Sequence, residues 1–196
     1  TDVRVIVCTL LNTDWYIKQM RDREPKVPIT FTDEEIARLR PIALKGGGVA
    51  WNDDLMIQHI IRVADWKRPI YFATSVAPAK WKPYEQYLET QGFVMRLVPY
   101  QGTRMLNVYL MRRNFEKVFA FSGILTGDGR IDGSVYLEKD LGTTLNNYGV
   151  AASELANALG QQKDYAGAVR WNEVAIRFTS HLKPANIMLG VYYALN

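Results

Sequence analysis

The sequence predicts an α/β fold, with a mostly parallel sheet and flanking helices, followed by an all-α region of helical hairpins. Two observations support this prediction. Over residues 1–112, apolar runs typical of buried strands alternate with amphipathic helical segments, which is the order that crossover connections of a parallel sheet produce. From about Leu141 onward the sequence is helical in pattern and rich in Ala, Leu and Asn. We therefore expect an α/β domain over 1–112, a connecting helix and Gly/Asp-rich turn over 113–140, and paired helices over 141–196.

The first strand is predicted at 3–11, because the run VRVIVCTLL is almost continuously apolar, like a strand buried on both faces. The polar residues Asn12, Thr13 and Asp14 follow it and supply caps for a helix through Met20. A strand followed by a helix is the unit from which parallel sheets are built.

Two helices are expected before the next strand. Thr32 and Glu35 have the spacing of a capping box, which predicts a helix that ends by Pro41. After the three glycines at 46–48, apolar residues recur every three or four positions from Asn52 onward, which predicts a longer, well-buried helix.

Three further runs complete the predicted sheet. The runs IYFATS, from Ile70, and FVMRLVP, from Phe93, are apolar and bounded by turn residues, as strands are. The segment KPYEQYLETQG between them predicts a short helix that ends at Gly92. The run NVYLM at 107–111 predicts one more strand.

The helical region has a 34-residue period, which is the length of a tetratricopeptide repeat. The period relates Leu155-Ala156 to Leu189-Gly190, and Leu159 to Tyr193. Small or aromatic residues also stand where the paired helices of such a repeat approach closely, namely Tyr165, Ala168 and Ala175.

We interpret residues 141–196 as tetratricopeptide-like helices, with an antiparallel helix pair of accidental spacing as the alternative. The usual closing proline is absent at Ser180 and comes late, as Pro184. Because one repeat cannot bury its own faces, it must pack on the α/β part, on further repeats, or on both.

Composition and charge exclude several classes of protein. The chain has 24 basic and 20 acidic residues, a net charge of +4, but the basic residues form no run longer than a pair. A nucleic-acid-binding protein normally shows a clustered basic stripe or a recognisable module, so we expect no nucleic-acid partner. The single cysteine, Cys8, excludes an internal disulfide and, by itself, a thiolate metal site.

The longest apolar run, at 5–11, is too short to span a bilayer, and the sequence shows no signal peptide. We expect these residues to be soluble and monomeric. Because the chain begins without a Met and ends within a helical pattern, we expect a piece of a longer protein whose targeting or membrane segments lie outside it.

The residues that could carry catalysis are few and scattered. His59 lies within an apolar helix and His181 in a predicted loop, and no G-x-S-x-G motif accompanies either. We interpret His59 as a structural histidine. The segment DGRID places Asp128 and Asp132 close together but lacks the other ligands of a calcium loop, so a turn is favoured. We therefore expect no catalytic residue, no metal site and no cofactor in this chain.

Asp14 is a candidate ligand residue, because it follows the carboxyl end of a predicted strand, where open α/β sheets bind their ligands. The same position suits a helix cap, and no second acid, base or metal ligand is spaced to act with it, so capping is favoured. Aromatic residues gather around DWKRPIYF and KWKPYEQYLE, where they either pack the core or line a sugar or peptide platform. The candidate ligand or interface residues are Asp14, Trp15, Tyr16, Trp81 and Tyr84.

Four stretches together resemble one known family: DVRVIVCTLLNTDWYIKQMRD, RPIYFATSV, YEQYLETQGFVMRLVP and NNYGVAASELANAL. They are similar to the soluble C-terminal part of a family of multi-pass membrane proteins whose animal relatives are protein O-mannosyltransferases. The resemblance implies a parent with membrane helices of the GT-C glycosyltransferase type, followed by an extracytoplasmic α/β domain and tetratricopeptide-like repeats. It carries no catalytic residue into this chain, since the catalytic acid of such enzymes lies in the membrane part. The stretch ARLRPIALKGGGVAW, at 37–51, departs from the family pattern.

The resemblance and the 34-residue period lead us to expect a non-catalytic accessory domain of a glycosyltransferase-like parent. It would be tethered at the extracytoplasmic (periplasmic) face of the membrane, with its α/β part docked on the transferase and its helices binding a protein or peptide acceptor. Two alternatives stay open: a scaffold of the cell envelope with no transferase attached, and a soluble α/β enzyme that uses Asp14, Ser75 and His59.

Overall fold

The chain divides into two compact units, each with its own core. In the computed structural model, residues 3–102, 105–121, 123–127, 130–178 and 183–195 are described. Unit 1 comprises Thr1–Ile70 and Val76–Pro83, and unit 2 comprises Tyr71–Ser75 and Tyr84–Asn196. The predicted residues Asp128, Ser180 and His181 lie outside the described ranges.

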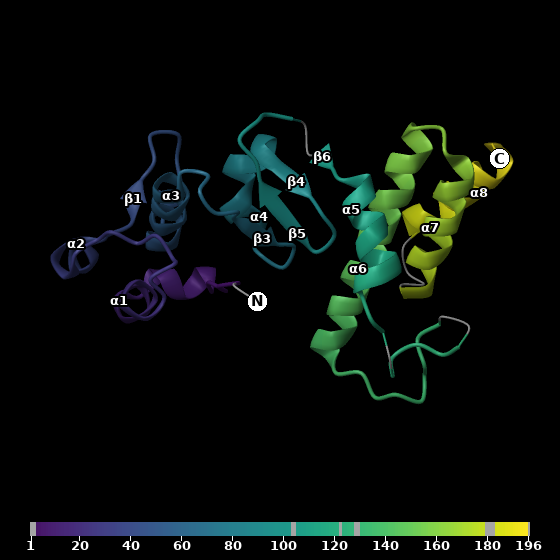
Figure 1. Ribbon diagram of the computed structural model, residues 1–196, viewed down its shortest axis with the longest axis horizontal. Helices are drawn as coiled ribbons and strands as arrows, with labels where there is room; N and C mark the ends of the chain where they lie inside the picture. Colours follow the sequence, from purple (N-terminus) through teal and green to yellow (C-terminus); the bar gives the residue numbers. More distant parts are fainter. Residues whose placement is uncertain (1–2, 103–104, 122, 128–129, 179–182, 196) are drawn as a thin grey trace. The chain divides into compact units, whose positions relative to one another are not determined.

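Unit 1 is mostly helical (Figure 1). Its elements are a 3-10 helix η1 (Cys8–Asn12), α1 (Asp14–Arg23), α2 (Asp33–Arg38), a hairpin of β1 (Ile42–Ala43) and β2 (Val49–Ala50), α3 (Asn52–Ala64) and α4 (Pro78–Trp81). The predicted capping box is confirmed: Thr32 Oγ1 accepts from the backbone N of Glu35, and Glu35 Oε2 accepts from the backbone N of Thr32. One fully buried side chain from each of several elements forms the core, namely Leu11, Ile17, Ile36 and Met56.

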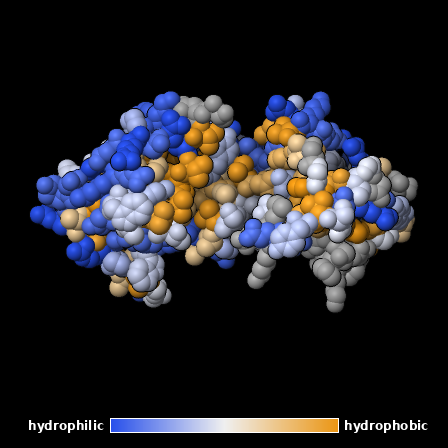
Figure 2. All heavy atoms as spheres, turned by 90° about the horizontal axis from the view of Figure 1, so that it is seen from below, coloured by the Kyte–Doolittle hydropathy of each residue, from blue (hydrophilic) through white to orange (hydrophobic). Residues whose placement is uncertain are grey.

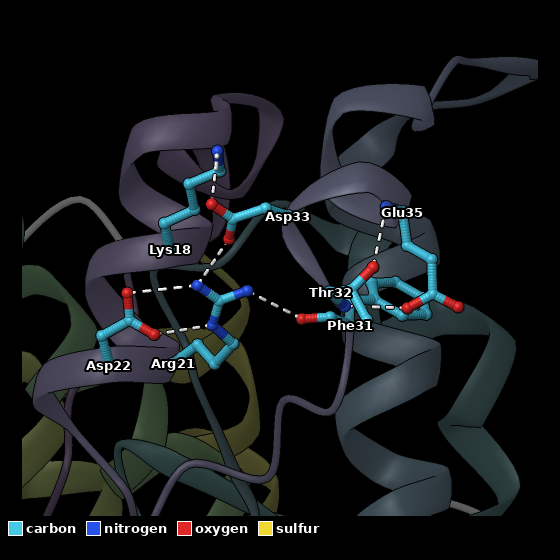
Figure 3. Close-up of polar contacts among 7 residues, drawn as sticks. All are labelled: Lys18, Arg21, Asp22, Phe31, Thr32, Asp33 and Glu35. Atoms are coloured by element: carbon cyan, nitrogen blue, oxygen red, sulfur yellow. Dashed lines mark hydrogen bonds and ion pairs between the residues drawn. The ribbon is translucent and has the colours of Figure 1, made fainter.

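An ion-pair network holds α1 against the start of α2 (Figure 3). The guanidinium of Arg21 donates to Asp22 Oδ1 at 2.6 Å and to Asp33 Oδ1 at 2.7 Å, and it also donates to the backbone O of Phe31 at 2.9 Å. Lys18 Nζ lies 3.3 Å from the other Asp33 oxygen. These bonds lower the pKa of both carboxyls, and for Asp33 the hydrogen bond from Arg21 is the larger cause.

Unit 2 begins with a small sheet and continues with helices. The strands β3 (Tyr71–Ala73), β4 (Leu88–Thr90), β5 (Val94–Leu97) and β6 (Met105–Leu106) lie in the order β3-β5-β4-β6. A 3-10 segment, η2 (Lys82–Tyr87), precedes β4 along the chain. The helices are α5 (Val108–Arg113), a π-helical turn η3 (Asn114–Val118), α6 (Lys139–Gln161), α7 (Tyr165–Phe178) and α8 (Lys183–Leu195).

The predicted mostly parallel α/β sheet is wrong. Strand β5 pairs antiparallel with both β3 and β4, and among the described strands only β4 and β6 pair in parallel. The predicted strand at 3–11 is not formed: the chain turns into η1 from Cys8, and Val3, Val5 and Val7 are exposed. Because η1 satisfies its backbone groups locally, as in the bond from Thr13 N to Leu10 O, this segment needs no partner strand.

Two more local predictions fail for physical reasons that the structure shows. Gly92 ends no helix; it occupies the turn between β4 and β5 with a φ of +108°, and Gln91 N donates to Val94 O across that turn. The run at 107–111 is helical instead of extended, because Asn107 Oδ1 caps α5 by accepting from the backbone N of Leu110 at 2.9 Å.

The predicted helical C-terminal region is confirmed. Helices α6, α7 and α8 share a core with α5, made largely of small and aromatic side chains: Met111, Ala151, Ala152, Leu155, Ala156, Leu159, Ala168, Trp171, Ala175 and Tyr192. Phe93, from the turn between β4 and β5, and Phe115, from η3, pack against the same core, so the sheet and the helices belong to one unit. The assignment of these helices to the tetratricopeptide class stays a prediction, as do the predicted domain boundaries.

The surface mixes apolar and hydrophilic patches, as the face drawn in Figure 2 shows. Large apolar side chains are exposed in both units, among them Trp15, Leu44 and Trp51 in unit 1 and Tyr109 and Tyr136 in unit 2. None of the helices in the described ranges combines the length and apolar character that crossing a bilayer demands.

Candidate functional site

The residues predicted at the start of α1 have three different environments. Asp14 is the first residue of the helix, where its carboxylate is favoured by the helix dipole, and Thr13 takes the N-cap position without a side-chain cap bond. Trp15 is 58% exposed. Tyr16 is buried, and its hydroxyl accepts a hydrogen bond from the backbone N of Val7 at 2.9 Å. Tyr16 therefore fixes the exposed N-terminal segment, while Trp15 presents a ring to solvent.

The two other predicted residues fall in different units. Trp81, in unit 1, is partly buried, and its indole Nε1 donates to the backbone O of Val76 at 3.1 Å. Tyr84, in unit 2, stacks on Phe72 with ring centroids 5.9 Å apart. Both rings thus contribute to packing within their own unit. The five predicted residues remain candidates for binding, and they are divided between the two units.

A polar cluster that the sequence did not predict joins η1, α3 and α4. Asp53, the second residue of α3, is only 2% exposed. Lys80 Nζ, from α4, lies 2.7 Å from Asp53 Oδ1 and 2.7 Å from Asp54 Oδ1. Asn12 Oδ1, from η1, accepts from the backbone N of Asp53 at 3.0 Å. Three elements of unit 1 are therefore tied together at the start of α3.

The charges of this cluster do not suit acid–base or nucleophilic chemistry at neutral pH. Burial lowers the pKa of Lys80, but the hydrogen bonds to Asp53 and Asp54 outweigh burial, and the net effect raises that pKa. Burial, and after it the charge of Asp53, raises the pKa of the nearby Cys8 thiol. The lysine stays an ammonium and the cysteine a thiol, so the arrangement acts as a structural clamp.

His59 is held in a structural role, as the sequence predicted. It is 4% exposed, and its Nε2 accepts a hydrogen bond from the backbone N of Thr30 at 3.1 Å. Its ring stacks on Phe31, and burial, followed by the charge of Arg62, lowers its pKa. Among the described residues of unit 1, the hydrogen-bond partners of His59 are Thr30 and Arg62 and do not include Asp14.

The described residues contain no group of three or more His, Cys, Asp and Glu side chains that could hold a metal ion. Within the DGRID segment, Asp132 Oδ1 accepts from both the backbone N and the hydroxyl of Ser134, which is the hydrogen bonding of a turn. These bonds lower the pKa of Asp132.

A hollow of about 600 Å³ lies beside α7 and α8 in unit 2, which is within the volume range of ligand sites. Its lining combines two guanidinium groups, one carboxylate and four apolar side chains: Arg130, Ile131, Glu173, Ile176, Arg177, Phe178 and Leu189. The hydroxyl of Tyr193, from α8, donates to Glu173 Oε1, and this bond raises the pKa of Tyr193. The hollow can receive an apolar group together with an anion.

Sequence reasoning missed both the clamp and the hollow. The aspartates at the start of α3 are typical of any helix N-terminus, and nothing local relates them to a lysine at position 80. The hollow forms only if Arg130 and Arg177 lie close together, and their proximity depends on how the segment around residue 130 packs against α7.

Comparison with known proteins identifies one family. Residues 1–41 and 34–114 match the family described as TMEM260-associated domain 2, and together these ranges span 114 of the 196 residues. The two ranges overlap at 34–41, immediately before the β1–β2 hairpin. Neither the curated proteins nor the solved structures contain a significant match to the chain.

Proposed function

This chain belongs to the family TMEM260-associated domain 2, and on that basis we propose that it is a non-catalytic accessory domain of a membrane-embedded protein O-glycosyltransferase-like protein. The family is tied to TMEM260, a protein O-mannosyltransferase-like protein. The match over residues 1–114 is the observation that carries the proposal. In this proposal the domain lies on the extracytoplasmic face of the membrane, and chemistry occurs in the membrane-embedded part.

The proposed role of the helical region is to bind the protein or peptide acceptor. Support comes from the hollow beside α7, where Arg177 is exposed and Ile176 and Leu189 add apolar surface. Arginine recognises carboxylates through paired hydrogen bonds, and neighbouring apolar side chains hold an adjacent residue of an extended peptide. An acceptor segment with an acidic residue next to an apolar one fits this lining.

The test compares the glycosyltransferase-like parent with variants of this hollow. Arg177→Glu reverses the charge of an exposed lining residue, and Lys117→Glu makes the same charge change at an exposed position outside the lining. We expect Arg177→Glu to raise the KM for the protein acceptor at least about tenfold, as loss of a charged contact does, with little change in kcat. Lys117→Glu should leave both constants unchanged.

Deleting the accessory domain provides the second arm of the test. If the parent lacking residues 1–196 modified its protein acceptor at the full rate, the accessory role would be refuted. If the deletion abolished transfer while Arg177→Glu behaved like Lys117→Glu, the accessory role would hold and the hollow would not be the acceptor site.

A further inference from the structure

The hairpin between α2 and α3 contains the longest unbroken run of exposed residues in the described part of unit 1. Residues 40–51, named here the hairpin arm, contain β1, β2 and the glycine turn at 46–48. Every residue from 41 to 49 is exposed, and a Cβ added at any of the three glycines would meet nothing within 4 Å. Figure 1 shows the loop that joins the two strands standing clear of the other ribbons of unit 1.

The hairpin arm exposes apolar side chains on both of its faces. Ile42 pairs with Ala50 and Ala43 with Val49, and residues paired directly across a hairpin share a face. Alternation then places Leu44 on the face of Ile42, and Trp51 on the face of Val49. These four large side chains are strongly exposed: Ile42 by 52%, Leu44 by 51%, Val49 by 45% and Trp51 by 55%.

The charged residues between Glu35 and Asp53 are all basic. Residues 36–52 include three basic residues, Arg38, Arg40 and Lys45, and no acidic residue. All three are exposed. Acidic residues resume immediately outside this segment, at 33–35 and at 53–54, so the positive charge is confined to the hairpin arm and the end of α2.

We propose that the hairpin arm is a membrane-surface anchor that inserts shallowly into the headgroup region of a bilayer containing anionic phospholipid. A protein partner would cover one face of a slender hairpin, whereas the lipid interface surrounds it and accommodates apolar side chains on both faces. The cations attract anionic headgroups, and a tryptophan is suited to the boundary between headgroups and acyl chains.

The geometry limits the depth of insertion. Each strand with its half of the turn covers about four residues, roughly 13 Å, so the hairpin arm reaches the interface and cannot cross the bilayer. The outer edges of a two-stranded hairpin carry backbone N–H and C=O groups that do not pair with the other strand. Water and headgroups can hydrogen-bond these groups at the interface, whereas hydrocarbon cannot. The inference does not depend on acceptor binding, because it concerns unit 1 alone.

The test is sedimentation of the purified 196-residue chain with vesicles of phosphatidylcholine, with and without about a third of phosphatidylglycerol. We expect binding to the anionic vesicles, weakened by salt, and a loss of about fivefold in affinity for each of Arg40→Gln and Lys45→Gln. The double variant Ile42→Ser/Leu44→Ser should lose at least about tenfold. The control Tyr109→Ser/Val118→Ser, which removes exposed apolar side chains of unit 2, should bind like the parent chain.

Circular dichroism shows whether each arm variant is folded. If one is not, a second measurement on the folded chain tests the membrane-anchor proposal. Vesicles with brominated acyl chains should quench the tryptophan fluorescence of the unsubstituted chain, and Trp51→Phe should remove most of that quenching. The proposal is overturned if the chain does not bind anionic vesicles, if the arm variants bind as well as the unit 2 control, or if quenching is the same without Trp51.

Discussion

Removing Lys80 should destabilise unit 1 severely, because it would leave a buried carboxylate without its partner. Asp53 is 2% exposed and the Lys80 side chain 16% exposed, so neither group is well solvated in the folded state. Breaking such a pair from one side costs about 3–5 kcal/mol. Native domains have only about 5–15 kcal/mol of stability, so Lys80→Met should remove a large share of it.

Urea unfolding followed by tryptophan fluorescence measures this loss. Trp15, Trp51, Trp66 and Trp81 belong to unit 1 and only Trp171 to unit 2, so the signal reports mainly on the unit that contains the clamp. With a slope of about 1–2 kcal/mol per molar urea for a unit of this size, the midpoint should fall by about 2 M or more.

The chain offers a matched control in Lys67, which lies 3.4 Å from Asp65 with both side chains more than 60% exposed. Lys67→Met deletes the same charge from a solvated pair and should leave the midpoint nearly unchanged. Adding Asp53→Asn to Lys80→Met should recover part of the loss, since the unpaired charge is then gone. Equal midpoints for Lys80→Met and Lys67→Met would refute the assignment of the cluster as a clamp.

Three other predictions concern buried groups. Asn172 is fully buried with neither amide atom paired, so Asn172→Leu should stabilise unit 2 by about 1–2 kcal/mol; a melting temperature no higher than that of the parent chain would contradict this. In α6, a Cβ added at Gly160 would lie 2.5 Å from the Tyr192 ring, whereas one added at Gly142 would meet nothing within 4 Å. Gly160→Ala should therefore destabilise unit 2 by about 1–3 kcal/mol, and Gly142→Ala should stabilise it by up to about 1 kcal/mol. Folding lowers the pKa of His59, so the unfolded chain takes up a proton at this residue first as the pH falls through 6.5, and the stability of the folded chain should decrease there. His59→Gln should therefore flatten the profile of melting temperature against pH between about pH 5 and 7. An unchanged slope would argue against this.

Local sequence signals predicted local structure well where one segment satisfies its own groups. The capping box of Thr32 and Glu35 and the amphipathic helix from Asn52 need no information from elsewhere in the chain, and both are formed. The fold class failed because strand pairing is not local. Gly92 is suited equally to a helix end and to a β-turn, and only the pairing of Leu88 with Leu97 decides between them.

The same dependence on contacts between distant segments explains why the candidate site was only partly predicted. Trp15 was predicted only as a candidate ligand or interface residue, and its side chain is 58% exposed. The Asp53–Lys80 pair joins positions 27 residues apart, and a carboxylate at a helix start is far more often a cap than half of a buried pair. No pattern within either segment distinguishes these cases.

The clamp and the hairpin arm are connected through α3. Trp51 ends the hairpin arm, and its backbone N donates to Asp54 Oδ2 at 2.8 Å, while Asp54 Oδ1 accepts from Lys80. The base of the hairpin arm is therefore bound to the same carboxylate that ties α4 to α3. A surface anchor transmits orientation only if its base is rigid, so Lys80→Met should loosen the hairpin arm even in molecules that remain folded. Hydrogen exchange should detect this as faster exchange at Val49 and Trp51 with no change at the Arg21 network of α1, and equal rates in the two proteins would show that the hairpin arm is supported independently of the clamp.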